Sequence, residues 1–148
     1  MMKRLLKNSA IAFALVVGLV SCNSSKEAVS LDALSTGTWE LVKINGKDVQ
    51  ASDYGRGIPT VSFSKEESRI SGNGGCNTYS GPFTLSENAS IEIGPVMSTK
   101  MACMNGGNGE SVYFKALDEV NKIKATKDKV VFLKDDTEVL EYKLSQSK

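Results

Sequence analysis

The sulfur-containing side chains are the residues whose types and spacing come nearest to a chemical site in this chain. Met97, Met101, Cys103 and Met104 lie in one short segment, and thioethers and thiolates are the ligands that Cu(I) selects. On a strand, Met97, Met101 and Cys103 would share one face because their spacings are even. Methionine is also an ordinary filler of apolar cores, so we expect core packing, with no metal and no cofactor. A sulfur-ligated Cu(I) site is the alternative.

The sequence excludes several catalytic arrangements. The chain contains no histidine, which excludes Ser-His-Asp triads and Cys-His pairs. Ser62 and Lys65 form a Ser-x-x-Lys pattern, but the partner motifs Ser-Asp-Asn and Lys-Thr-Gly do not occur in the sequence. We therefore expect that the protein is not an enzyme.

Residues 71–81 form the stretch richest in glycine and asparagine, and they include Cys76. The stretch does not match a phosphate-binding loop, because no Gly-Lys-Ser/Thr follows it and the third glycine of a dinucleotide-binding turn is missing. We expect its glycines to supply positive φ angles or a bulge. Asn77 is expected to bond to nearby backbone groups.

The start of the chain predicts an address. Residues 1–21 combine a basic beginning with an apolar run that is shorter than the roughly 20 residues that span a bilayer. The ending Leu-Val-Ser-Cys at residues 19–22 resembles the bacterial lipobox, in which the chain is cut before a cysteine that becomes acylated. We therefore expect lipidation of Cys22 and anchoring to a membrane of the bacterial cell envelope. Asn23 follows this cysteine, whereas an aspartate at that position retains proteobacterial lipoproteins in the inner membrane. We therefore expect the outer membrane.

The charge of the processed chain argues against nucleic acid as a partner. Residues 1–21 carry three of the eighteen Lys and Arg residues, so fifteen remain against seventeen Asp and Glu, a net charge of −2. Binding to phosphates needs a clustered basic surface. We expect a monomer that is attached to the membrane through its N-terminal lipid and whose partner is a protein or a small molecule.

The elements that position these residues are predicted to be mostly strands. We interpret residues 22–36 as a flexible tether and residues 37–148 as one domain. Alternating apolar and polar residues predict about eight short strands in an antiparallel meander, which closes into a barrel-like or strongly bent sheet. These strands cover residues 38–44, 60–64, 68–72, 78–85, 89–93, 122–126, 130–133 and 139–144.

One α-helix is predicted before the last three strands. Apolar residues recur at spacings of three and four between residues 108 and 120, which is typical of an amphipathic helix. Asn108 is expected to cap it, and Glu110 lies in the first turn, where the helix dipole favours an acid.

The glycine-rich stretch and the segment around Cys103 together resemble a known family. The pattern from Gly72 to Phe83, the opening Trp39-x-Leu41 and the pattern Thr99-x-x-Ala102-Cys103 are similar to those of the META (HslJ-like) domain family, over residues 37–144. The resemblance implies a mainly-β, barrel-like domain with one helix, often behind a lipoprotein leader, with a loose link to envelope stress. It implies no catalytic residues. The family-motif residues are Gly72, Gly75, Asn77, Tyr79, Gly81 and Thr99.

Cys76 and Cys103 are predicted to form a disulfide. Each lies in its own family motif, two cysteines remain once Cys22 is acylated, and the predicted compartment is oxidising. Two separate buried thiols are the alternative. We expect a lipid-anchored, non-catalytic envelope protein with a binding or stress role. The alternatives are the Cu(I) binder and an inhibitor or partner of an envelope enzyme that acts through residues 105–109.

Overall fold

The computed structural model describes residues 29–104 and 107–145. The predicted targeting segment, Cys22 and the first part of the predicted tether lie outside these residues. The helices are α1 (Leu31–Leu34), a short 3-10 helix (Ala51–Asp53) and α2 (Gly109–Asp118). The strands are β1 (Thr38–Ile44), β2 (Lys47–Asp48), β3 (Thr60–Ser64), β4 (Arg69–Asn73), β5 (Thr78–Leu85), β6 (Ile91–Ile93), β7 (Met97–Ser98), β8 (Lys122–Ala125), β9 (Lys129–Lys134) and β10 (Thr137–Leu144).

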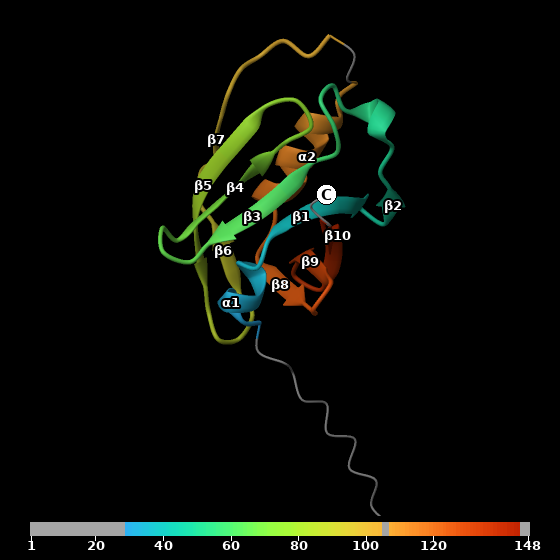
Figure 1. Cartoon of the computed structure of the whole chain (residues 1–148). Helices are drawn as coiled ribbons and strands as arrows, with labels where there is room; N and C mark the ends of the chain where they lie inside the picture. Colours follow the sequence, from blue (N-terminus) through green and yellow to red (C-terminus); the bar gives the residue numbers. More distant parts are fainter. Residues whose placement is uncertain (1–28, 105–106, 146–148) are drawn as a thin grey trace, which may run out of the picture.

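The strands form one antiparallel sheet that curls into a nearly closed barrel (Figure 1). Its order is β6-β5-β4-β3-β1-β10-β9-β8, so β1 lies in the middle and pairs with the last strand, β10. The two ends of this order approach each other, because the backbone of Ile91 bonds to Asn121 and that of Ile123 bonds to Ala89. The predicted mainly-β, barrel-like architecture is confirmed, and each of the eight predicted strands matches an observed one.

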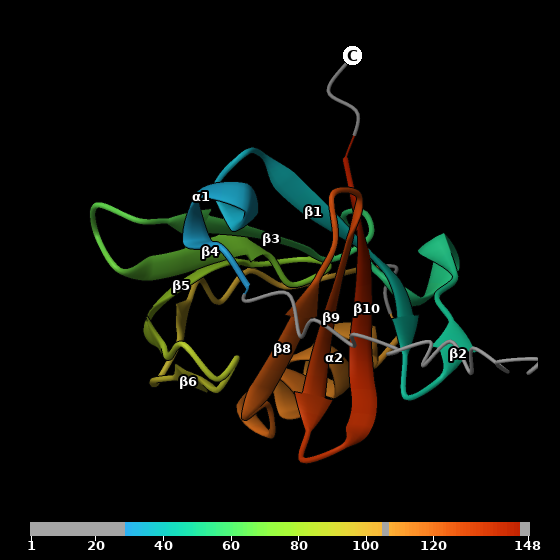
Figure 2. The ribbon, with the colours of Figure 1, turned by 90° about the horizontal axis from the view of Figure 1, so that it is seen from below.

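Aromatic side chains fill the inside of this sheet. Phe63 on β3 contacts Phe83 on β5 and Phe132 on β9 edge to face, with ring centroids 5.5 and 6.2 Å apart. Phe132 contacts Tyr142 on β10 in the same way. Viewed from below, β8–β10 run steeply across the direction of β3–β5 (Figure 2), and this sharp bend brings side chains from distant strands into one core.

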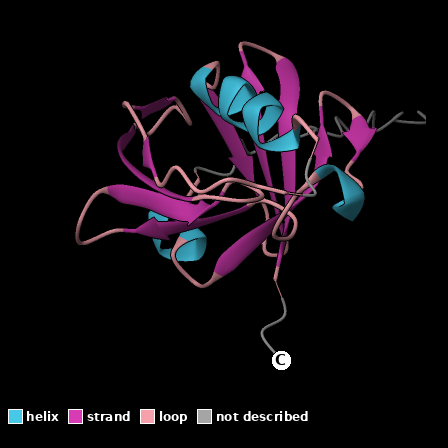
Figure 3. Ribbon diagram, turned by 90° about the horizontal axis from the view of Figure 1, so that it is seen from above, coloured by secondary structure: helices cyan, strands magenta, loops and turns pink. Residues whose placement is uncertain are grey.

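The predicted helix exists as α2, which lies between the two halves of the bent sheet (Figure 3). Tyr113, Ala116 and Leu117 of α2 are buried, as the apolar spacing predicts. Asn108 is the N-cap residue of α2, as predicted, but its side chain makes no capping hydrogen bond. Among the described residues, no helix is long and apolar enough to cross a membrane.

The folded domain begins before residue 37, so the predicted tether is too long. Leu31–Leu34 form α1, and Leu34 is fully buried. The indole nitrogen Nε1 of Trp39 donates a hydrogen bond of 2.8 Å to the carbonyl of Leu34. The burial of Leu34 was not predicted, because the residues before it are mostly polar. It stabilises the domain by removing a leucine side chain from water.

Candidate functional site

The candidate site is built on the turn between β4 and β5. The side-chain oxygen of Asn73 accepts a hydrogen bond of 2.6 Å from the backbone N–H of Gly75, which is an Asx turn. Gly75 has a φ of +112°, a conformation that glycine adopts without strain. A side chain at Gly75 would also overlap the ring of Tyr54. The expected positive φ is therefore confirmed at Gly75.

The other motif residues on these two strands have packing roles. Gly72 on β4 pairs with Tyr79 on β5, and a side chain at Gly72 would collide with the backbone carbonyl of Thr60. Gly81 pairs with Ile70 and is buried. Gly72 therefore lets β3 lie close to β4, and Gly81 lets the backbone of Pro95 and Val96 lie close to β5.

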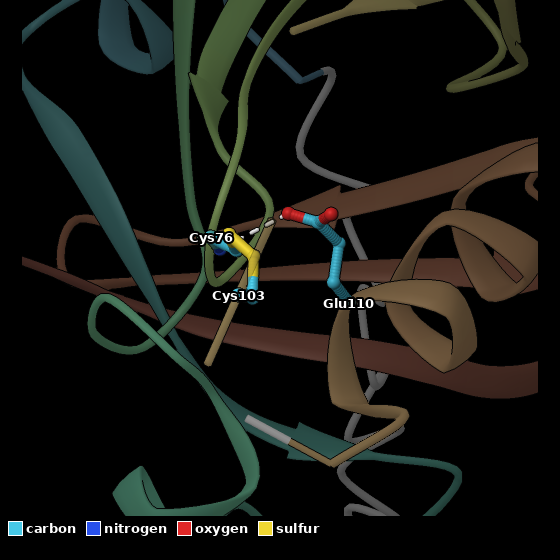
Figure 4. A group of neighbouring side chains, drawn as sticks. All are labelled: Cys76, Cys103 and Glu110. Carbon is cyan, nitrogen blue, oxygen red and sulfur yellow. Dashed lines mark hydrogen bonds between the residues drawn. A yellow bond between two sulfur atoms is a disulfide. The ribbon is translucent and has the colours of Figure 1, made fainter. Parts of the chain in front are cut away.

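Glu110, in the first turn of α2, holds the β4–β5 turn. Its Oε2 accepts hydrogen bonds from the backbone N–H groups of Cys76, at 3.0 Å, and Asn77, at 2.5 Å. Its Oε1 accepts a bond of 2.7 Å from the side-chain amide of Asn77. Figure 4 shows the carboxylate pointing toward the two cysteines. The sequence assigned Glu110 only an interaction with the helix dipole, because nothing in its spacing indicates a partner 33 residues away.

Asn77 connects this turn to the segment that follows β7. It is buried, and its Oδ1 accepts bonds from the hydroxyl of Thr99, at 2.9 Å, and the backbone N–H of Met101, at 2.7 Å. The expectation that Asn77 bonds to nearby backbone is wrong, because its backbone partner is 24 residues away. We call Asn77, Glu110, Thr99 and the backbone groups of Cys76 and Met101 the Asn77 network.

A disulfide joins Cys76 to Cys103, as predicted, with α-carbons 6.0 Å apart. Cys76 is buried and Cys103 is half-buried. The disulfide and the Asn77 network hold the same segment, which has regular strand structure only at Met97 and Ser98. The covalent and the polar attachments therefore lie side by side.

Residues 97–104, which we call the methionine segment, carry three methionines whose side chains lie at the surface. Met97, Met101 and Met104 are 72, 43 and 91% exposed. The expectation that they pack in the core is wrong. Met97 lies on the two-residue strand β7, both of whose residues are exposed, and the chain that carries Met101 and Met104 has left the sheet. Arg56 approaches the sulfur of Met101, with Nη1 3.8 Å from Sδ.

A second polar cluster lies inside the barrel, and we call it the tyrosine network. The hydroxyl of Tyr142 donates to Tyr113 at 3.1 Å, the hydroxyls of Tyr113 and Tyr79 are 2.8 Å apart, and Tyr79 donates to the carbonyl of Thr60 at 2.9 Å. Burial raises the pKa of all three tyrosines well above the usual 10.0. They stay neutral, and each hydroxyl has a partner.

Comparison with solved structures supports the fold. An NMR structure of a protein is 27% identical, covers 78% of this chain and 95% of that chain, and has a TM-score of 0.59. The NMR structure of a protein from Burkholderia xenovorans is 22% identical and covers 99% of this chain and 100% of that chain, with a TM-score of 0.58. A crystal structure of a DUF4847 family protein from Bacteroides vulgatus ATCC 8482 is 12% identical, covers 79% and 98%, and has a TM-score of 0.56.

A search of curated proteins found no match. The model of the META domain matches residues 32–147, which include all of α1 except Leu31 and all ten strands. This match confirms the resemblance carried by the glycine-rich stretch and the segment around Cys103. The chain therefore belongs to the META domain family.

Proposed function

We propose that the protein is a lipid-anchored component of the bacterial cell envelope that binds a protein partner and performs no catalysis. The observation that carries the proposal is the methionine segment, whose apolar side chains are exposed although the backbone beneath them is fixed by a disulfide. Exposed apolar groups often mark interaction sites. Methionine suits such sites because its flexible, polarisable side chain adapts to the partner.

The interior of the barrel has little free space and few unbonded polar groups for a partner to contact. It is filled by packed aromatic rings, and the hydroxyls of Tyr79, Tyr113 and Tyr142 bond to one another. Binding therefore falls to the outside of the sheet. Next to the methionine segment, Val96 lines a groove with Ile93, Phe114 and Leu117, which extends the apolar surface toward α2.

The attachment point favours presenting this surface away from the membrane. Figure 1 places α1 and the start of the domain at the opposite end of the barrel from the segment that follows β7. Val29 is the seventh residue after Cys22, a reach of about 25 Å when the chain is extended. A lipid on Cys22 would therefore keep the α1 end near the bilayer and leave the methionine segment free for a partner.

The proposed partner binding is tested by capture from envelope membranes. A photo-crosslinking residue in place of Met104 should capture a defined protein from cells that express the anchored chain. The same residue in place of Val112, which is exposed on α2, is the matched control and should capture much less. Identical sets of captured proteins at the two positions would remove the support for a methionine-segment interface.

The proposed anchoring depends on Cys22. A Cys22→Ser chain should keep its targeting segment and should not be labelled by radioactive fatty acid. Replacement of the adjacent Ser21 by Ala is the control, because small residues are tolerated before the cleavage point. Processing and fatty-acid labelling of the Cys22→Ser chain would contradict the anchoring.

A Cu(I)-binding function is the second candidate. The exposure of Met97 and Met101 supports it, because exposed thioether groups can reach a metal ion, and the sequence alone did not reveal this exposure. Against it, the disulfide removes the thiolate of Cys103 from the set of ligands. We expect no tight Cu(I) site in the oxidised protein. Titration with Cu(I) against a competing chelator decides this, and stoichiometric binding that is lost in a Met97→Leu, Met101→Leu double variant would reverse the order of the two candidates.

A further inference from the structure

Three side chains of different elements place ligand atoms around one point beside the β4–β5 turn (Figure 4). The sulfurs of Cys76 and Cys103 and a carboxylate oxygen of Glu110 all lie within 4.8 Å of one another. Zn²⁺ binds sulfur at about 2.3 Å and carboxylate oxygen at about 2.1 Å in tetrahedral geometry, so its ligand atoms lie roughly 3.5 to 4 Å apart. Opening the sulfur–sulfur bond would bring the cysteines close to that spacing.

We propose that the reduced protein binds one Zn²⁺ through Cys76, Cys103 and Glu110, so that the disulfide and the zinc site are alternative states of one cluster. Thiolate sulfur together with carboxylate oxygen is a ligand set that zinc accepts, whereas Cu(I) prefers sulfur alone. Cys103 and Glu110 are half-buried, which leaves a side of the site open to a water as the fourth ligand.

The surroundings of Glu110 fit the role of a metal ligand. Three N–H donors, two from the backbone of Cys76 and Asn77 and one from the side chain of Asn77, already fix the orientation of its carboxylate. Hydrogen bonds of this kind orient metal ligands and support affinity. Across residues 29–104 and 107–145, the ion pairs join lysines to other carboxylates, so no cation of these residues competes with zinc for Glu110.

The environment of the sulfurs also suits thiolates. The side-chain nitrogen of Asn77 lies 4.0 Å from the sulfur of Cys103, close enough to donate to a thiolate after a small movement. Because Asn77 also holds Thr99 and Met101, the segment that carries Cys103 stays attached when the disulfide is broken. The two cysteines therefore remain neighbours in the reduced protein.

The chemistry requires a dithiol reductant, such as a thiol–disulfide oxidoreductase. One of its thiolates attacks the Cys76–Cys103 bond, and the mixed disulfide is resolved by its second thiol. Two electrons and two protons pass to the cysteines, and the reductant becomes a disulfide. Zinc binding then displaces one proton from each cysteine thiol, two in total. A thiol oxidant reverses the sequence and releases the ion.

The test uses the full-length chain with Cys22→Ser, which removes the third cysteine. Reduced and oxidised forms are titrated with Zn²⁺ alone against a chromophoric chelator under anaerobic conditions. We expect one Zn²⁺ in the reduced form, with release of two protons at a pH where both thiols are protonated, and no stoichiometric binding in the oxidised form. Equal binding by the two forms, or binding of Cu(I) but not Zn²⁺, would overturn the proposal.

Substitutions test the ligand set. Glu110→Gln should weaken zinc binding by at least about 10- to 100-fold, because the loss of a residue that only supports a ligand already costs that much, and Cys103→Ser should abolish it. Asp118→Asn is the matched control on the exposed face of α2 and should bind as the parent chain does. If Glu110→Gln does not fold, Co²⁺ titration of the reduced parent gives a second measurement. Lack of sulfur-to-cobalt charge-transfer absorption would then sink the proposal.

Discussion

Helix α2 contributes one residue to each of two hydrogen-bond networks, and the networks are built differently. Tyr113 belongs to the tyrosine network inside the barrel, and Glu110, three residues earlier on the same helix face, belongs to the Asn77 network at its rim. The interior network consists of neutral, buried hydroxyls, and two of its three tyrosines lie on strands that backbone hydrogen bonds also join to their neighbours. The rim network uses a charged carboxylate and lies beside a disulfide.

The difference follows from how much backbone pairing supports each region. Tyr79 and Tyr142 lie on β5 and β10, each of which is paired along its length, so neutral hydrogen bonds are sufficient to satisfy their buried hydroxyls. The methionine segment has a strand of only two residues. It is therefore held by hydrogen bonds to the side chain of Asn77, which the charged Glu110 fixes in place, and by a covalent bond.

The largest expected effect is a loss of unfolding free energy at alkaline pH, which tests the tyrosine network inside the barrel. Because burial raises the pKa of Tyr79, Tyr113 and Tyr142, these tyrosines leave stability unchanged below pH 10. Above about pH 10 they ionise in the unfolded chain and stay neutral in the folded one, so stability falls. Each costs about 1.4 kcal/mol per pH unit, which gives roughly 4 kcal/mol for the three at pH 11.

Urea unfolding at pH 9 and pH 11 measures this loss. A Tyr142→Phe variant should be about 1 kcal/mol less stable at pH 9, because one buried hydrogen bond is lost. Its further loss between pH 9 and pH 11 should be smaller by one tyrosine's share. An identical alkaline loss in the variant and the parent would show that lysines or other groups, and not the interior network, control alkaline unfolding.

Removing the disulfide breaks the covalent half of the rim. The double variant Cys76→Ala, Cys103→Ala should lose about 3.5 kcal/mol of unfolding free energy, the chain entropy of a crosslink across 27 residues. Denaturant melts of the oxidised parent and the double variant give the difference. Cys76→Ala alone should be similar to the double variant. A loss below 1 kcal/mol would mean that the Asn77 network holds the methionine segment by itself.

Replacing Glu110 sharpens the polar half of the comparison. Glu110→Gln removes the charge that accepts hydrogen bonds from the backbone of Cys76 and Asn77, and we expect a loss of about 2 kcal/mol. Asp118→Asn removes a charge from an exposed position of the same helix and should change stability little. Hydrogen exchange should show faster exchange at Cys76 and Asn77 in Glu110→Gln, and unchanged rates there would contradict the acceptor role.

The smallest expected effect concerns the surface that the rim supports. Met104→Ser should change the unfolding free energy by no more than about 0.5 kcal/mol, because Met104 is 91% exposed and touches little. Thermal denaturation of the variant and the parent makes the comparison. A loss above 1 kcal/mol would place Met104 in the packing of the folded protein instead of on a free surface.

The barrel was predictable because its strands obey local rules. In β3 the alternation of Val61 and Phe63 with serines and threonine marks one buried face, and the change of period between residues 108 and 120 marks the only long helix in the sequence pattern. Both signals come from neighbours along the chain. The pairing of β1 with β10 was not assigned, because no local pattern records which distant strands will lie together.

The rim was predictable only in part. Cys76 and Cys103 could be paired because two cysteines remained and each occupied a family motif. The role of Glu110 depends on a contact with Asn77 from 33 residues away, and an acid in the first turn of a helix is common without such a partner. The methionines were assigned to the core because apolar composition suggests burial, whereas the chain leaves the sheet after Ser98.

The pairing of β1 with β10, in which Trp39 lies opposite Leu144, affects the order in which the strands can pair during synthesis of the chain. Strand β1 is among the first parts of the domain to be synthesised, yet it gains its neighbour β10 only when nearly the whole chain is available. Such distant pairings slow folding, because a long loop must close before they form. The strands from β3 to β6 can pair earlier with their sequential neighbours. A chain that ends before β10 would leave β1 with an unpaired edge, open to aggregation.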